Sequence, residues 1–83
     1  MAKVVVYSKE SCPYCVQAKE LLKRKGVDYQ EIRVDLDPMQ LQEMMERSGR
    51  RTVPQIFINE HHVGGYDDLY ALEVAKKLDD LLK

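Results

Sequence analysis

An unbroken apolar run near the start of the chain, Val4-Val5-Val6-Tyr7, is the feature that most limits the fold. A strand covered on one face alternates apolar and polar residues, whereas a continuous run suits a strand buried on both faces. Such a strand needs helices packed against its sheet, and apolar patterns with helical spacing follow it in the chain. The run therefore predicts a central strand from Lys3 to Ser8 in an α/β domain.

A helix is predicted from about Pro13 to Lys25, directly after the central strand. Ser11 is a favoured N-cap residue, and proline is tolerated in the first helical turn because its missing N–H would have had no partner there. Gly26 is expected to end the helix, whose inner stripe is formed by Val16, Ala18, Leu21 and Leu22. A strand from 28 to 34 follows, and the strand–helix–strand unit implies a right-handed crossover between parallel strands.

A second helix is predicted to begin at Asp35-Leu36-Asp37-Pro38 and to end at Ser48-Gly49. Its apolar residues recur at helical spacing and are rich in methionine: Met39, Leu41, Met44 and Met45. We interpret these methionines as flexible core filler rather than as a metal site.

The last third of the chain predicts a hairpin and a helix. Residues 53–58 form a third strand, which pairs with a short fourth strand at 62–64. Asp67 and Asp68 are expected to cap a final helix that continues to the end of the chain. The order βαβαββα then predicts one domain over residues 1–83, in which a four-stranded mixed β-sheet is flanked by three helices.

Charge and length exclude several classes of partner. Thirteen Lys and Arg residues against fourteen Asp and Glu give a net charge of −1, so no long-range field favours nucleic acid or an anionic membrane. The short basic clusters Lys23-Arg24-Lys25 and Arg50-Arg51 are interpreted as helix-end or solvated charge. The apolar run at the N-terminus is too short for a signal peptide or a membrane span. We therefore expect a cytoplasmic monomer with no nucleic acid and no membrane partner.

The two cysteines lie two residues apart at the predicted strand-to-helix junction. In a reducing cytosol a purely structural bridge is not expected, and so small a loop would constrain little of the unfolded chain. Cys12 should face solvent at the helix N-terminus, where free N–H groups and the positive end of the helix dipole favour a thiolate. Cys15 should lie one turn inside the helix on the same side. The pair predicts a redox dithiol with Cys12 as the nucleophile and Cys15 as the resolving thiol.

Half of a zinc knuckle is the alternative interpretation of this pair, and it would need two further ligands. Only His61 and His62 remain for that purpose. Adjacent residues in a strand point to opposite faces, so one metal ion is unsuited to both histidines. No metal is expected, and the histidines are interpreted as turn and edge residues.

Three motifs together resemble a dithiol glutaredoxin of the small bacterial type: Cys12-Pro13-Tyr14-Cys15 after a buried strand, Thr52-Val53-Pro54 before another, and Gly64-Gly65-Tyr66-Asp67-Asp68-Leu69 at the last helix. The resemblance covers essentially the whole chain, and the motifs stand in the right order on the right elements. It implies a thioredoxin-like fold and a redox-active centre that reduces protein disulfides and glutathione mixed disulfides. It also implies glutathione as the reducing co-substrate, within electron transport and cell redox homeostasis.

The resemblance further implies a glutathione site. In this family the proline of the Thr-Val-Pro motif is cis, and the backbone before it pairs with the cysteinyl part of glutathione. The glycine turn and the helix start after it receive the γ-glutamyl carboxylate, while the aspartates meet the ammonium group. A lysine before the cysteines meets the glycyl carboxylate, and the tyrosine between them shapes the groove wall. The expected glutathione-binding residues are Lys9, Tyr14, Thr52, Val53, Pro54, Gly65, Tyr66, Asp67 and Asp68.

One residue departs from the family pattern. Tyr66 stands where a smaller or sulfur-bearing side chain is expected between the glycines and the aspartates. Its side chain is expected either to crowd the groove or to contact the ligand, while its backbone role persists.

Two related functions remain as alternatives. A redoxin that donates electrons to ribonucleotide reductase has the same fold and thiol pair, but a γ-glutamyl site is of little use to a protein reduced by a flavoenzyme. A carrier of a glutathione-ligated [2Fe–2S] cluster would use Cys12 thiolates from two chains. Pro13 and the second thiol argue against the carrier, because cluster-carrying members typically have glycine or serine after the first cysteine. The sequence thus favours a glutathione-dependent oxidoreductase acting on disulfide-bonded or glutathionylated proteins, ribonucleotide reductase included.

Overall fold

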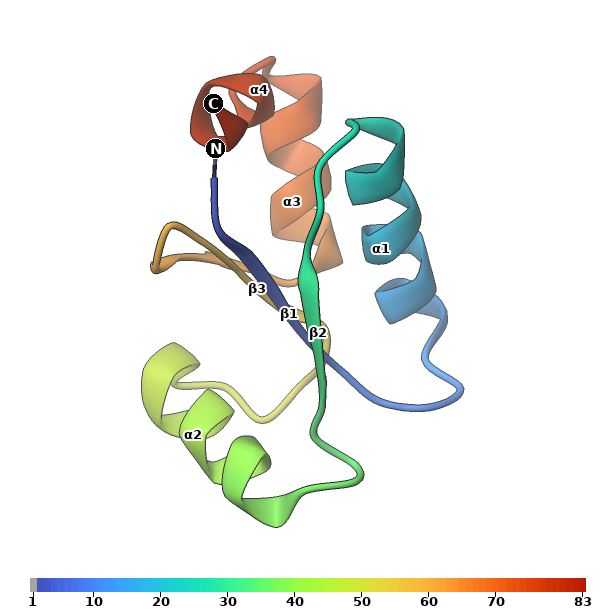
Figure 1. Ribbon diagram of the computed structural model, residues 1–83, viewed down its shortest axis with the longest axis vertical. Coiled ribbons are helices and arrows are strands. Elements are labelled where there is room, and N and C mark those ends of the chain that lie inside the picture. Colours follow the sequence, from blue (N-terminus) through green and yellow to red (C-terminus); the bar gives the residue numbers. More distant parts are fainter. Residues whose placement is uncertain (1) are drawn as a thin grey trace.

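The computed structural model describes residues 2–83 and contains a four-stranded sheet in the order β2-β1-β3-β4 (Figure 1). β1 (Val4–Ser8) pairs in parallel with β2 (Gln30–Arg33) and antiparallel with β3 (Gln55–Ile58). β3 in turn pairs antiparallel with β4 (His61–Gly64). The sheet is therefore mixed, as the sequence predicts, and the valine-rich β1 is one of its two inner strands.

Helices cover both faces of this sheet. α1 (Pro13–Arg24) and α3 (Tyr66–Val74) lie together on one side, with α4 (Leu78–Leu82) beside them, and α2 (Pro38–Ser48) lies on the other (Figure 1). No helix within residues 2–83 has the length and apolar character needed to cross a membrane.

The continuous valine run is explained by two separate cores. Side chains alternate between the faces of a strand, so neighbouring residues of β1 enter different clusters. Val4 and Val6 pack with buried residues of α1, α3 and α4, among them Leu22, Leu69 and Leu78. The other face of β1 packs with α2 and β3 through Val5, Tyr7, Met44 and Phe57. Burial of β1 on both faces is thus confirmed.

The final helical segment differs from the single helix predicted. Lys76 adopts a φ of 59°, which ends α3 before α4 begins at Leu78. The apolar spacing predicts one continuous helix because it persists across this break. Leu69 before the break and Leu78 after it are both fully buried. The ammonium group of Lys25 lies 2.8 Å from carboxylates of both Glu73 and Asp79, so the end of α1 is tied to both helices.

Several smaller expectations are also corrected. β2 and β3 begin at Gln30 and Gln55, each two residues later than predicted. Val16, expected in the inner stripe of α1, is 48% exposed, and Met39 is 81% exposed although Met44 is fully buried. Amphipathic spacing identifies a helix but does not fix which edge residues of its stripe the neighbouring elements cover.

Candidate active site

Cys12 is the N-cap residue of α1. Its backbone is extended (φ −111°, ψ 103°), and its sulfur accepts a hydrogen bond from the N–H of Cys15 at 3.3 Å. The predicted N-cap, Ser11, is wrong, because that residue has a φ of 58° and belongs to the turn before the helix. The Cys12 sulfur therefore occupies the position at which a helix N-terminus stabilises negative charge.

Cys12 does not face solvent as the sequence suggested, since only 6% of its surface is exposed. The segment before β3 lies beside it, and its thiol donates toward the carbonyl oxygen of Val53 at 3.8 Å. The peptide bond between Val53 and Pro54 is cis, which confirms the expectation for this motif. The segment that covers the sulfur is thus the one expected to align a substrate beside it.

Cys15 lies inside the first turn of α1 and is 1% exposed. Burial raises the pKa of its thiol to about 12, and the hydrogen bond with Cys12 acts in the same direction. The backbone N–H of Lys9 and the charge of Lys19 oppose this rise in the pKa without cancelling it. Cys15 is therefore a thiol at neutral pH, within reach of Cys12, which suits a residue that acts second.

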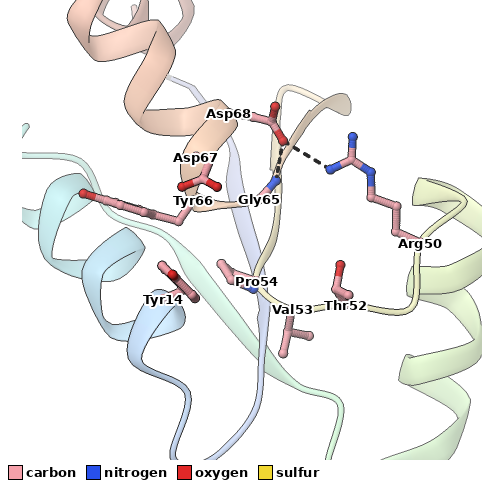
Figure 2. Close-up of a pocket in the computed structure, with 9 residues that line it drawn as sticks. All are labelled: Tyr14, Arg50, Thr52, Val53, Pro54, Gly65, Tyr66, Asp67 and Asp68. Atoms are coloured by element: carbon pink, nitrogen blue, oxygen red, sulfur yellow. Dashed lines mark hydrogen bonds and ion pairs between the residues drawn. The ribbon is translucent and has the colours of Figure 1, made fainter.

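A cleft of about 260 Å³ opens at Val53, the residue that Cys12 contacts, between three segments of the chain (Figure 2). One wall comes from α1, the floor from the segment before β3, and the other wall from the start of α3. Its lining residues are Tyr14, Arg50, Thr52, Val53, Pro54, Gly65, Tyr66, Asp67 and Asp68. Eight of the nine residues expected to bind glutathione are therefore brought together in one cleft.

The glycine turn at the start of α3 is fixed by a single carboxylate. Asp68 accepts hydrogen bonds from the N–H of Gly65 at 3.0 Å and from Arg50 at 3.2 Å (Figure 2). These two bonds, that of Gly65 first, lower the pKa of Asp68. Gly64 has a φ of 120°, and a side chain there would collide with the Asp68 carboxylate. The predicted N-caps are corrected, because Gly65 is the N-cap of α3 and Asp68 reaches back to it from the third helical position.

Lys9 is the predicted site residue that the structure leaves outside the cleft. It lines a neighbouring hollow together with Arg51, Thr52 and Val53, and the last two residues line both spaces. Lys9 is thus placed next to the cleft on the far side of the Thr52-Val53 segment.

Arg50 also lines the cleft, although its place in a short basic cluster predicts solvated charge. Its guanidinium group is half exposed and pairs with Asp68 across the cleft. The available signal was its position two residues before Thr52-Val53-Pro54, because a cation next to a segment that is expected to align a substrate suits a carboxylate ligand.

Tyr66 neither blocks the cleft nor points into its centre. Its ring stacks on that of Tyr14, with centroids 6.4 Å apart and an angle of 28° between the planes. In Figure 2 the Tyr66 ring extends over α1, away from Thr52 and Arg50. The residue therefore lengthens the aromatic wall of the cleft.

The two histidines are separated as predicted, with His61 exposed and His62 half-buried. The ring of His62 packs against Phe57 at 4.9 Å between centroids and forms a 2.7 Å hydrogen bond with Gln55. Within residues 2–83 no group of three or more His, Cys, Asp or Glu side chains is placed to hold a metal ion.

Comparison with known proteins gives a consistent result. The Glutaredoxin family profile matches residues 4–63. The chain is 57% identical to Glutaredoxin 3 of Escherichia coli over 83 residues, which is the full length of both. Its structure is similar to a buckwheat glutaredoxin–glutathione complex (TM-score 0.90, 33% identity, 98% of this chain and 76% of the other). It is also similar to a solution structure of glutaredoxin from Brucella melitensis (TM-score 0.88, 57% identity, 100% and 90% covered).

Proposed function

This chain belongs to the glutaredoxin family, and we propose that Cys12 and Cys15 are the thiols with which it reduces protein disulfides and glutathione mixed disulfides. Family membership makes it a glutathione-dependent thiol–disulfide oxidoreductase with the thioredoxin-like fold. The observation that carries the proposal is the position of Cys12, which caps α1 beside the Val53 carbonyl at the cleft.

The reaction begins at Cys12. Its thiolate is stabilised by the Cys15 N–H and by the N-terminal end of α1, and it attacks one sulfur of a target disulfide. An S–S bond forms between Cys12 and that sulfur, while the second target sulfur leaves with the bonding electron pair and takes up a proton. With a glutathionylated protein, Cys12 takes the glutathione sulfur and the protein leaves as a free thiol.

Cys15 completes the reduction of a protein disulfide. After losing its proton it attacks Cys12, so the Cys12–Cys15 disulfide forms and the target leaves as a thiol. Two glutathione molecules then restore the dithiol and end as one molecule of glutathione disulfide. Two electrons thus pass from glutathione to the target. The raised pKa of Cys15 makes its deprotonation the costly event in this step.

We propose that the cleft seats glutathione with its sulfur toward Cys12. Thr52, Val53 and Pro54 would align the cysteinyl part, since an extended ligand can pair with the backbone there. The N–H groups at the start of α3, near Gly65, would receive the γ-glutamyl carboxylate.

The charged groups around the cleft complete this proposal. Asp68 already has two partners within the protein, so Asp67 would meet the ammonium group. Arg50 would add positive charge on the carboxylate side, and Lys9 would meet the glycyl carboxylate from the adjoining hollow. Tyr14 and Tyr66 would form the aromatic wall.

The wider setting is also part of the proposal. Disulfide-bonded and glutathionylated proteins are its protein partners, ribonucleotide reductase among them, and the chain acts as a cytoplasmic monomer.

A comparison of electron sources tests the function. Turnover of a small mixed disulfide should require glutathione and glutathione reductase, while thioredoxin reductase with NADPH alone should give none. Equal turnover without glutathione would contradict the proposal.

A further inference from the structure

Three tyrosine rings form a continuous row from the cleft across the surface between α1 and α3. Tyr14 stacks on Tyr66 with centroids 6.4 Å apart, and Tyr66 contacts Tyr70, one turn further along α3, at 5.9 Å. We call these three residues the tyrosine ladder. Tyr14 and Tyr66 line the cleft, whereas Tyr70 lies beyond it, beside a hollow lined by Leu21 and Arg24.

The two outer rings of the ladder lie at the surface, while Tyr66 between them is half-buried and packs against the core formed with α1, α3 and α4. Tyr14 is 57% exposed and Tyr70 is 50% exposed, in contrast to Tyr7, which is fully buried. Aromatic residues contribute much of the energy of protein interfaces, because a rigid ring buries a large area at little entropic cost. The three rings are therefore a contiguous aromatic patch rather than scattered exposed residues, which is the kind of surface that marks an interaction site.

The ladder is continuous with the cleft at which the substrate sulfur must lie. We propose that it is a docking surface for the polypeptide of a disulfide substrate, and that it selects an extended segment carrying an aromatic side chain near the reacting cysteine. This inference rests on the function proposed above, and it concerns the choice among substrates rather than the chemistry.

The spacing of the rings suits an extended chain. Side chains on one side of an extended segment recur about every 6.6–6.8 Å, close to the two ring spacings of the ladder. A segment aligned on the backbone at Val53 presents alternate side chains to one wall of the cleft. About four residues of such a chain cover the two ring spacings laid end to end.

The positive charge of Arg24, at the Tyr70 end of the ladder, favours an aromatic over a cationic side chain on the substrate. Arg24 lies beside Tyr70, and within residues 2–83 it takes part in no ion pair, whereas the neighbouring Lys25 is neutralised by Glu73 and Asp79. A lysine or arginine on the substrate would meet this uncompensated charge. An aromatic ring would instead contact the tyrosines and present its face to the guanidinium group.

The test uses symmetric disulfide dimers of short peptides, in which both sulfurs are equivalent. One peptide has a phenylalanine two residues before the cysteine, and a second has it two residues after the cysteine. Each has a matched peptide in which alanine replaces the phenylalanine. Turnover is followed as NADPH consumption with glutathione and glutathione reductase, next to the small mixed disulfide of glutathione and 2-mercaptoethanol. We expect kcat/KM to be about three- to tenfold higher for at least one phenylalanine peptide than for its alanine partner.

The variant that isolates the ladder is Tyr70→Ala, because Tyr70 lies outside the cleft. It should remove the preference for phenylalanine and leave the small mixed disulfide unchanged, while Tyr70→Phe should keep the preference because the ring remains. Val74→Ala, a change on the same helix at a 64% exposed residue outside the ladder, is the matched control and should behave as the unaltered chain.

Two results would overturn the inference: equal kcat/KM for phenylalanine and alanine peptides, or a preference that survives Tyr70→Ala. In both cases turnover of the small mixed disulfide would leave the proposed function standing. Loss of that turnover in the unaltered chain would instead reject the function itself.

Discussion

Two helices of this protein begin in nearly the same way and serve different purposes. α1 begins with Cys12 followed by proline, and α2 begins with Asp37 followed by proline. Both capping residues are extended, with ψ 103°, and both side chains accept a backbone N–H of the first turn, at 3.3 Å and 3.0 Å. Cys12 is buried beside a cleft and a second thiol, whereas Asp37 is exposed.

The comparison shows that capping geometry alone does not make a reactive site. Each cap satisfies an N–H group that the helix leaves free, and each places a polarisable or charged atom at the positive end of the helix. Only at α1 does another part of the chain, the segment around Val53, contact the capping atom and also line a cleft beside it. Reactivity therefore depends on tertiary contacts added to a local motif.

The largest expected effect comes from Cys12→Ser. Serine is a good N-cap residue, so the free energy of unfolding should change by less than about 1 kcal/mol. Turnover of every disulfide should fall by at least about a thousandfold, because a hydroxyl does not ionise at neutral pH. NADPH-coupled assays and urea unfolding measure the two effects. Retained turnover would show that Cys12 only caps α1, just as Asp37 only caps α2.

Cys15→Ser separates the two kinds of substrate. Removal of glutathione from a glutathionylated peptide should persist, because that reaction needs only Cys12. Reduction of a stable intramolecular protein disulfide should be lost, since nothing else within α1 can resolve the mixed disulfide. Mass spectrometry should detect the trapped adduct between Cys12 and the target. If both reactions continued at the original rate, the second thiol would have no part in the site.

The pH dependence of the resolving step should follow the pKa of Cys15. That pKa is raised to about 12 in the dithiol, and burial, its largest cause, persists when Cys12 is held in a mixed disulfide, so the thiolate fraction of Cys15 should still rise with pH through neutrality. Release of a target thiol from a preformed Cys12 mixed disulfide should accelerate accordingly between pH 6 and pH 8. Stopped-flow measurement of the released thiol gives the rate. A rate that levels off below pH 8 would show that the buried thiol ionises more easily than its surroundings imply.

Asp67→Ala tests a charged residue at a third helix start, where the cap is supplied by other groups. Loss of one exposed charge contact should raise the glutathione concentration needed for half-maximal turnover about two- to fivefold. The thermal unfolding temperature should stay nearly constant, because Asp68 rather than Asp67 holds the turn. Asp67→Glu, which keeps the charge, is the matched variant. An unchanged requirement for glutathione would remove Asp67 from the proposed site.

The smallest effect on turnover is expected from Asp37→Ala. Loss of the cap of α2 should lower the free energy of unfolding by about 1 kcal/mol, and kcat and KM should not change. Urea unfolding with parallel assays checks both expectations. A fall in turnover would couple α2 to the site and weaken the contrast between the two helix starts.

Local pattern was sufficient to predict the sheet and most of the helices. The valine run gave the inner strand because burial on both faces leaves no polar positions, and the proline and glycine residues at helix ends gave the starts and stops. The split between α3 and α4 escaped prediction because Leu69 and Leu78 keep the apolar spacing across it. The strand order itself depends on which strands pair, which no single segment encodes.

The sequence predicts which residues gather at the candidate site, but not how exposed they are or which of them pair. Cys12 was expected to be exposed, but Val53, about forty positions later in the chain, covers it. Arg50 was overlooked for the same reason, because its pairing with Asp68 exists only in the folded chain. Lys9 stands three residues before Cys12 in the sequence and yet lines the neighbouring hollow.

The lack of space at Gly64 has a practical consequence for anyone who wishes to redesign this enzyme. Every replacement there would have to adopt a backbone conformation that ordinary residues resist, and would also displace the Asp68 carboxylate. Libraries randomised at this turn should consequently yield misfolded clones rather than altered preferences. Diversity is better introduced at the exposed end of the aromatic wall, where Tyr14 is 57% exposed.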